Sequence, residues 1–263
     1  MKKFSTLALA ALLVTALSVP AAAANTFEAA SGTPTIDGKL DDAYKAAQEI
    51  AINVKTSGDG KTSGTARCLW DSKNIYVFFD ITDPIISEKA NQSEYYKTDS
   101  VEFFIDLTNT PGDITKINAG QWTAQAPISD AKGDWQGRGQ HRDTNVKNGT
   151  YKSVKTDNGY AVEMQIPWGD QYTPKADAQI KVAFHINSDE DGKDGREGEY
   201  FAGTDQGNAW SESSKYDTLV LTSAKYEDPK QDTAAQTADM GIIAAVASLA
   251  ASGAAYISLK KRK

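Results

Sequence analysis

The sequence predicts an all-β fold, an antiparallel β-sandwich, on three observations. Apolar and polar residues alternate along several short segments, tight-turn residues separate those segments, and no long segment repeats its apolar residues at helical spacing. Alternation gives each strand one apolar face. Short strands joined by tight turns bury those faces against each other in a sandwich or a barrel.

Four segments show the alternation most clearly, and they are residues 75–81, 101–105, 160–166 and 180–186. In the last segment the even-numbered residues are apolar and share one face, opposite Lys181, His185 and Asn187. The turn signals are glycine-containing pairs and triplets at residues 37–38, 58–60, 111–112, 148–149, 158–159 and 191–192. One short helix is predicted over residues 41–50, with Asp41 as its N-cap.

The first 24 residues resemble a secretory signal peptide. Lys2 and Lys3 are followed by an apolar stretch over residues 7–19 and by three alanines that end at Ala24. We therefore expect residues 1–24 to direct export and to be removed before Asn25. A membrane anchor is the alternative, although the apolar stretch is short for one.

The opposite end of the chain predicts attachment to the cell surface. Residues 241–259 form an uncharged stretch of 19 residues, and four basic residues follow it. We expect residues 240–263 to form a transmembrane or anchoring helix, with the basic end on the cytoplasmic side. The segment also resembles the sorting tail of Gram-positive surface proteins, although residues 236–241 depart from that family's motif. An alanine-rich helix packed on the domain is the alternative.

Between these ends we expect one folded domain at residues 25–223 and a polar linker at residues 224–239. Residues 25–239 contain 22 basic and 35 acidic residues, a net charge of −13. Such a surface disfavours nucleic acid and anionic lipid as partners and suits neutral ligands or cations. With one cysteine, two histidines and no nucleotide-binding or hydrolase motif, the sequence favours a binding domain over an enzyme.

Several residue types carry candidate chemistry. Trp70 and Trp168 lie in predicted strands and are expected in the core, where Cys68 is also expected. Five other aromatic residues lie in polar, turn-rich segments, where they either stack on a sugar or pack under loops: Tyr95, Tyr96, Trp122, Trp135 and Trp210. Asp99 and Glu102 are three residues apart on a strand, so they face opposite sides and make a poor acid–base pair.

Two further alternatives concern a metal and a haem. The acidic loop at residues 189–199 offers oxygen ligands for calcium, but Lys193 occupies a ligand position, and a solvated turn is the alternative. His141 or His185, paired with Met164, would supply the axial ligands of a haem-binding electron-transfer domain. A polar histidine without a ligand is the simpler interpretation of each.

Several short sequence blocks between about residues 33 and 221 resemble the family 9 carbohydrate-binding module and occur in the same order as in that family. They are PTIDGKLDD at 34–42, LWD at 69–71, IYV at 75–77, DP at 83–84, DSVEFFID at 99–106, IPW at 166–168, REG at 196–198 and KYDTL at 215–219. The resemblance implies a β-sandwich that binds sugars without catalysing a reaction and often carries structural calcium.

The resemblance also implies particular site residues. Tyr96, where the family has tryptophan, and Trp210 correspond to two rings that clamp terminal sugars. The polar positions correspond to Thr123, Gln125 and Asn187, where the family has arginine, asparagine and glutamine, and to Asn208 after a one-residue shift. Asp83 corresponds to a calcium ligand. The implied partners are a carbohydrate and surface glycoside hydrolases, and the alternative is a surface adhesion domain without sugar binding.

Overall fold

The computed structural model describes residues 24–193, 195–203 and 205–227. The predicted signal peptide, up to residue 23, and the predicted anchoring segment at residues 240–263 lie outside these ranges, as does the linker beyond residue 227. Within the ranges described, no helix is long and apolar enough to cross a membrane.

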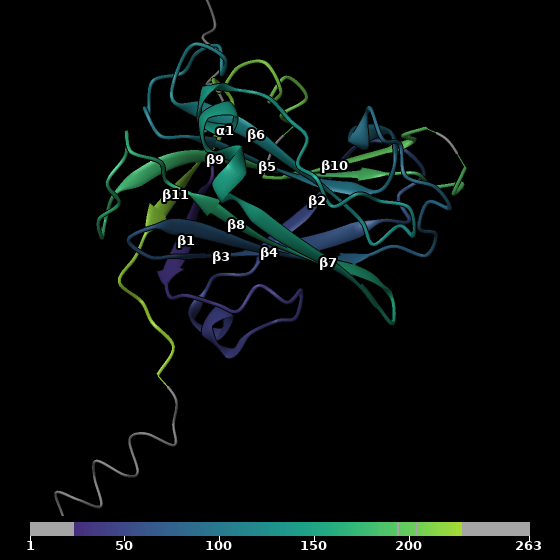
Figure 1. Cartoon of the computed structure of the whole chain (residues 1–263), viewed down its shortest axis with the longest axis horizontal. Helices are drawn as coiled ribbons and strands as arrows, with labels where there is room; N and C mark the ends of the chain where they lie inside the picture. The colour runs from purple at the N-terminus through teal and green to yellow at the C-terminus, as the bar shows by residue number, and fades with distance from the viewer. Residues whose placement is uncertain (1–23, 194, 204, 228–263) are drawn as a thin grey trace, which may run out of the picture.

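The described residues form two packed layers of strands (Figure 1). One layer holds five strands side by side in the order β2 (Ile50–Ser57), β3 (Ser63–Trp70), β4 (Asn74–Thr82), β8 (Gly159–Pro167) and β7 (Thr150–Thr156). The other layer holds β6 (Ala119–Gln125), β5 (Ser100–Asp106) and β9 (Gln179–Ser188), and β9 also pairs with β10 (Gly198–Ala202) and β11 (Asp217–Leu221). This arrangement confirms the predicted β-sandwich.

The layers are joined in two places. Strand β2 pairs with β10, and β1 (Thr26–Ser31) pairs with β11 and with the end of β3. Both pairings of β1 are parallel, whereas every other pairing between described strands is antiparallel. The expectation of an antiparallel sandwich therefore holds except at β1. Because β1 is the first strand of the described chain, no tight turn joins it to the strands it pairs with, β11 and β3, and a parallel pairing is possible.

The core lies between the two layers and follows the predicted alternation. The Phe184 ring on β9 packs against Phe103 on β5, with ring centres 5.4 Å apart, and against Phe79 on β4 at 6.3 Å. Trp168 is 2% exposed, and its Nε1 donates a 2.9 Å hydrogen bond to the carbonyl of Asp71. Cys68 is fully buried. The predicted core positions of Trp168 and Cys68 are confirmed, and Trp70 packs at the margin of the core while partly buried.

The short elements differ from the predicted helix. In place of a helix over residues 41–50, one 3₁₀ turn runs over Asp42–Ala46, and the side chain of Asp41 accepts a 2.9 Å hydrogen bond from Ala43 N. The turn ends early because Ala47 has an extended backbone. The other short elements are a 3₁₀ turn at Tyr95–Lys97, α1 at Gln140–Asn145 and a 3₁₀ turn at Val146–Asn148.

Candidate functional site

A cavity of about 440 Å³ lies on the outer face of the layer formed by β5, β6, β9 and β10. Strand alternation places it there. Val101 and Phe103 of β5 face the core, so Glu102 and Phe104 face outward into the cavity. The same alternation turns His185 of β9 outward, next to the core residue Phe184. The cavity floor therefore consists of the residues that alternate with the core.

Tyr96 and Trp210 are the exposed aromatic residues of the described chain, at 37% and 51% exposure, and both line this cavity. Tyr96 lies in the 3₁₀ turn before β5, and its hydroxyl donates a 2.7 Å hydrogen bond to Glu94. Trp210 lies in the turn before β11, where Ser211 N donates to the carbonyl of Asn208 at 2.9 Å. Two loops that are far apart in sequence thus bring two flat rings to one cavity.

An arginine side chain lies over each of the two rings. The Arg196 guanidinium lies 5.2 Å from the centre of the Tyr96 ring, and that of Arg138 lies 5.5 Å from the centre of the Trp210 ring. Arg196 is also held by Glu199, at 2.5 Å, and by Oδ1 of Asn187, at 2.9 Å. Both arginines line the cavity.

Two glycines position Arg138. The backbone N of Gln121 on β6 donates to the Arg138 carbonyl at 2.8 Å, so the loop lies directly against the strand. Gly137 and Gly139 have φ angles of 113° and 111°, and a Cβ at Gly137 would lie 2.1 Å from the Gln121 carbonyl oxygen. A Gly-Arg-Gly sequence at residues 137–139 is therefore needed for this close approach.

Glu102 and His185 form the polar floor of the cavity. Oε2 of Glu102 lies 2.8 Å from Nδ1 of His185, and its Oε1 accepts hydrogen bonds from Gln121 at 2.9 Å and Thr123 at 3.0 Å. Burial alone would raise the pKa of Glu102, but these hydrogen bonds and the nearby imidazole outweigh it and lower the pKa. Glu102 is thus an ionised, fully hydrogen-bonded carboxylate.

The four predicted polar site residues do not line the cavity. Thr123, Gln125 and Asn187 are buried, and Asn208 is exposed in the turn before Trp210. Thr123 and Asn187 lie behind residues that do line the cavity. The Thr123 hydroxyl donates a hydrogen bond to Glu102, and the Asn187 side-chain oxygen accepts one from Arg196. Gln125 donates instead to the carbonyl of Asn91, at 3.3 Å. The polar surface comes from residues that the sequence analysis did not select: Glu102, Gln121, Arg138, His185, Arg196, Glu199 and Gln206.

Three of the five aromatics that the sequence left open are packed inside the domain. Tyr95 and Trp122 are 2% and 0% exposed, and the Trp135 ring packs edge-on against Trp122, with ring centres 5.1 Å apart. Trp122 alternates on β6 with outward residues, so it faces the core despite its polar neighbours. For these three, packing inside the domain and not stacking on a sugar is the correct interpretation, with Trp122 in the core itself.

The histidines and Met164 are not brought together as a haem site would require. Met164 lies in the core between the layers, whereas His185 faces the outer cavity. His141 is 1% exposed, its Nδ1 accepts from Trp122 at 3.4 Å and its Nε2 lies 3.2 Å from the Trp168 carbonyl. Both of its ring nitrogens are therefore already paired.

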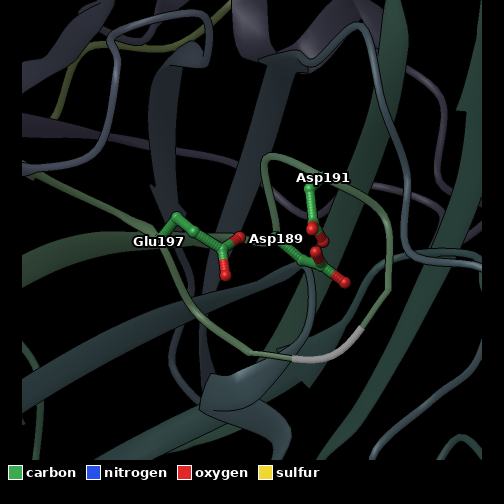
Figure 2. Close-up of side chains that lie close together, drawn as sticks. All are labelled: Asp189, Asp191 and Glu197. Carbon is green, nitrogen blue, oxygen red and sulfur yellow. The ribbon is translucent and has the colours of Figure 1, made fainter.

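A second site of interest is a group of carboxylates in the acidic loop after β9. Asp189, Asp191 and Glu197 place one oxygen each within 4.8 Å of one another (Figure 2). Asp83 and Asp189 are buried, and Oδ2 of each has no hydrogen-bond partner in the described chain. Two orphaned carboxylate oxygens are the donor type that calcium requires, so these residues fit that ion.

Asp99 links the two parts of this acidic cluster. Its Oδ1 accepts from Asp189 N at 2.9 Å, and its Oδ2 accepts from the backbone and hydroxyl of Ser87. Burial, together with the charge of Asp83, raises the pKa of Asp99 to about 8. Burial also raises the pKa of Asp83 and of Asp189. The cluster therefore resists full ionisation in the absence of a cation.

Fold and cavity together define a ligand-binding β-sandwich domain whose cavity is walled by aromatic rings and floored by polar groups. The chain belongs to the family described as "Carbohydrate family 9 binding domain-like", which matches residues 36–224. The family suggested by the sequence blocks is thereby confirmed. Because the homology is to a binding module and not to a catalytic domain, the protein is a binding domain, as predicted.

Relatives of this chain include large polysaccharide-degrading enzymes. It is 31% identical over 192 residues to endo-1,4-beta-xylanase A of Thermoanaerobacterium saccharolyticum, and 32% identical over 207 residues to exoglucanase XynX of Acetivibrio thermocellus. These matches cover 73% and 78% of this chain, but only 16% and 18% of the two relatives. The chain thus spans about a sixth of their length.

Solved structures share the fold. A family 9 carbohydrate-binding module from Caldicellulosiruptor kristjanssonii in complex with cellotriose gives a TM-score of 0.63 at 20% identity, covering 75% of this chain and 94% of that module. The same kind of module in complex with glucose gives a TM-score of 0.64 at 20% identity, covering 78% and 100%.

Proposed function

We propose that this domain binds the end of a neutral polysaccharide by stacking it between Tyr96 and Trp210. The observation that carries the proposal is that the two exposed aromatic residues of the described chain line one cavity. An aromatic ring exposed to water lacks the favourable free energy of burying its apolar surface. A bound sugar provides that burial, because its C–H face covers the aromatic ring.

The polar floor supports a sugar over a purely apolar ligand. Glu102, Gln121 and His185 lie at the bottom of the cavity, and hydroxyl groups are both donors and acceptors that match such a mixture. The relatives' names and the bound sugars of the solved modules suggest cello- and xylo-oligosaccharides as ligands.

A structural calcium ion is part of the same proposal. Asp83, Asp99, Asp189, Asp191 and Glu197 would hold it, supported by the two orphaned oxygens. When bound, calcium supplies positive charge that offsets the buried carboxylates and fixes the loop after β9. That loop carries Arg196, so the ion would also steady one wall of the cavity.

The domain's place in the cell completes the proposal. The features of residues 1–24 and 240–263 support export and tethering at the outer surface, in the membrane or the cell wall. A tethered binding domain raises the local concentration of polysaccharide, and surface glycoside hydrolases would benefit as partners.

Calorimetric titration of the domain with cellotriose and with xylotriose, in excess calcium, tests the proposal. Binding of at least one sugar that is lost in Trp210→Ala supports it. If neither sugar binds, and a wider glycan array with the same domain also shows no binding, the alternative of an adhesion domain without sugar binding replaces it.

A further inference from the structure

Two buried polar atoms at the cavity have no hydrogen-bond partner in the described part of the chain. They are Nε2 of His185 and Oε1 of Gln206. Both side chains line the cavity, and they are 4% and 0% exposed. Because an unpaired buried polar atom is costly, two of them at one cavity indicate groups that a ligand completes.

The surroundings of His185 fix which of its nitrogens is free to accept. The ring lies between Phe104 and Phe201, whose ring centres are 6.5 Å and 4.2 Å away. Its Nδ1 lies 2.8 Å from the carboxylate of Glu102, and a carboxylate only accepts, so Nδ1 carries the hydrogen. In the neutral ring, Nε2 is then a lone-pair acceptor.

Gln206 presents the second acceptor. Its Nε2 donates a 2.9 Å hydrogen bond to Oδ2 of Asp217, which orients the amide and leaves Oε1 without a donor. The floor therefore lacks two hydrogen-bond donors. A sugar supplies these as hydroxyl groups, whereas an apolar ligand of the same shape would leave both acceptors unpaired.

The charged groups that face His185 determine what protonation would do. They are Glu102 on β5, Glu199 on β10 and Arg196, which pairs with Glu199. Oε1 of Glu199 lies 3.9 Å from Nε2, too far for a hydrogen bond. A protonated Nε2 becomes a donor and attracts this carboxylate, whose side chain is 22% exposed. Nε2 can then no longer accept a hydrogen bond from a ligand, and the Glu199 carboxylate blocks the ligand's approach to it.

We infer that His185 Nε2 and Gln206 Oε1 are hydrogen-bond acceptors for ligand hydroxyls, and that only neutral His185 binds the ligand well. This inference depends on the proposed sugar-binding function. As a ligand enters, the Glu199 carboxylate shifts aside and a hydroxyl takes its place beside Nε2. His185 and Gln206 thus act as specificity-determining residues, and affinity falls when the medium becomes acidic.

Calorimetric titration with cellotriose between pH 5 and pH 8, in excess calcium, tests the inference on three proteins. For the wild type we expect the affinity to fall about three- to tenfold towards pH 5, as expected for one hydrogen bond. His185→Gln keeps an acceptor without a titratable ring, and its affinity should not change with pH. Gln206→Met should bind more weakly at every pH while keeping the wild-type pH profile.

A second readout needs no variant, which covers the case in which His185→Gln does not fold. If only neutral His185 binds, cellotriose expels protons in acidic solution, and the apparent binding heat then depends on the ionisation heat of the buffer. The absence of proton release by the wild type would overturn the inference. An unchanged pH profile in a folded His185→Gln would do the same.

These failures are distinguishable from failure of the proposed function. If His185 and Gln206 are not ligand partners, binding still occurs at pH 8 and still requires Trp210. If the wild type binds neither cellotriose nor xylotriose at any pH, the proposed function is wrong and this inference falls with it.

Discussion

The indole of Trp168 and the backbone of Asp71 are joined by a 2.9 Å hydrogen bond from Nε1 to the carbonyl oxygen. The Trp168 side chain that donates this bond is only 2% exposed. Trp168 is thus a core residue, in contrast to Trp210 at 51% exposure. Trp168 therefore packs in the fold, whereas Trp210 is the proposed ligand contact.

Replacing Trp168 by alanine should destabilise the fold. The change leaves a large cavity and an unpaired carbonyl, and we expect the free energy of unfolding to fall by about 3–5 kcal/mol. Urea denaturation followed by circular dichroism measures it, with Trp210→Ala as the matched control. If the two variants unfold at the same urea concentration, the assignment of Trp168 to the core is wrong.

His141 should make stability depend on pH below neutrality. Burial, partly opposed by backbone carbonyls, lowers the pKa of His141 from its ordinary value of 6.5 to about 4. The unfolded chain therefore binds a proton first, and the stability present above pH 6.5 is lost as the pH falls towards 4.

At one pKa unit per 1.36 kcal/mol, the loss is about 3 kcal/mol. Urea denaturation of the wild type and of His141→Gln from pH 7 to pH 4.5, in excess calcium, measures it. The variant should lose less stability than the wild type across this range. Parallel pH profiles would show that His141 is not the group responsible.

Calcium should stabilise the domain through Asp83. An ion that binds only the folded state contributes roughly 2.7 kcal/mol at a hundredfold excess over its dissociation constant. For a domain of this size we expect chelation to lower the Tm by about 5–10 °C. Asp83→Asn should show little response to calcium, whereas Asp80→Asn should respond like the wild type, because Asp80 is an exposed residue of β4, three residues before Asp83. A chelator-insensitive wild type would contradict the calcium proposal.

The chelated protein should lose stability as the pH rises through 8. The pKa of Asp99 is raised to about 8 by burial and by Asp83, so the folded state holds a proton that the unfolded chain releases. Stability from this source is complete below the ordinary aspartate pKa of about 3.9, falls steadily as the pH rises above that value, and is fully lost once the pH passes 8.

Thermal melts in chelator between pH 7 and pH 9 test this dependence, because His141 is then largely neutral in both the folded and the unfolded chain. Asp99→Asn should make the curve flatter, and excess calcium should flatten that of the wild type. A wild-type Tm that stays constant or rises with pH in chelator would refute the assignment.

Much of the fold follows from the sequence because period-2 alternation is a local property. Phe184 and His185 are adjacent, and alternation alone places one in the core and the other on the outer face. The same rule applies to Glu102, which lies between Val101 and Phe103, so the polar floor can be predicted from the sequence. The pairing of strand β1 cannot, because it depends on how strands elsewhere in the sequence place the edges of the two layers.

The walls of the site were only partly predictable. Tyr96 and Trp210 were found through the family resemblance, and polar neighbours could not separate them from Tyr95 and Trp122, which are buried. Arg138 reaches the cavity because two glycines let its loop lie on β6. The Gly-Arg-Gly sequence signals a close backbone approach, but not the strand that is approached.

The central claim is that Trp210 and Tyr96 hold a sugar between them, and calorimetry on Trp210→Ala tests it most directly. The titration uses cellotriose and xylotriose at pH 8 in excess calcium. Leu40→Ala is the matched control, since Leu40 is 49% exposed and does not line the cavity.

The loss of one stacked ring costs about 1–3 kcal/mol, by analogy with other flat ligands on aromatic residues. We therefore expect Trp210→Ala to weaken binding roughly tenfold to a hundredfold with an unchanged Tm, while Leu40→Ala binds like the wild type. Wild-type affinity in a folded Trp210→Ala would contradict the claim.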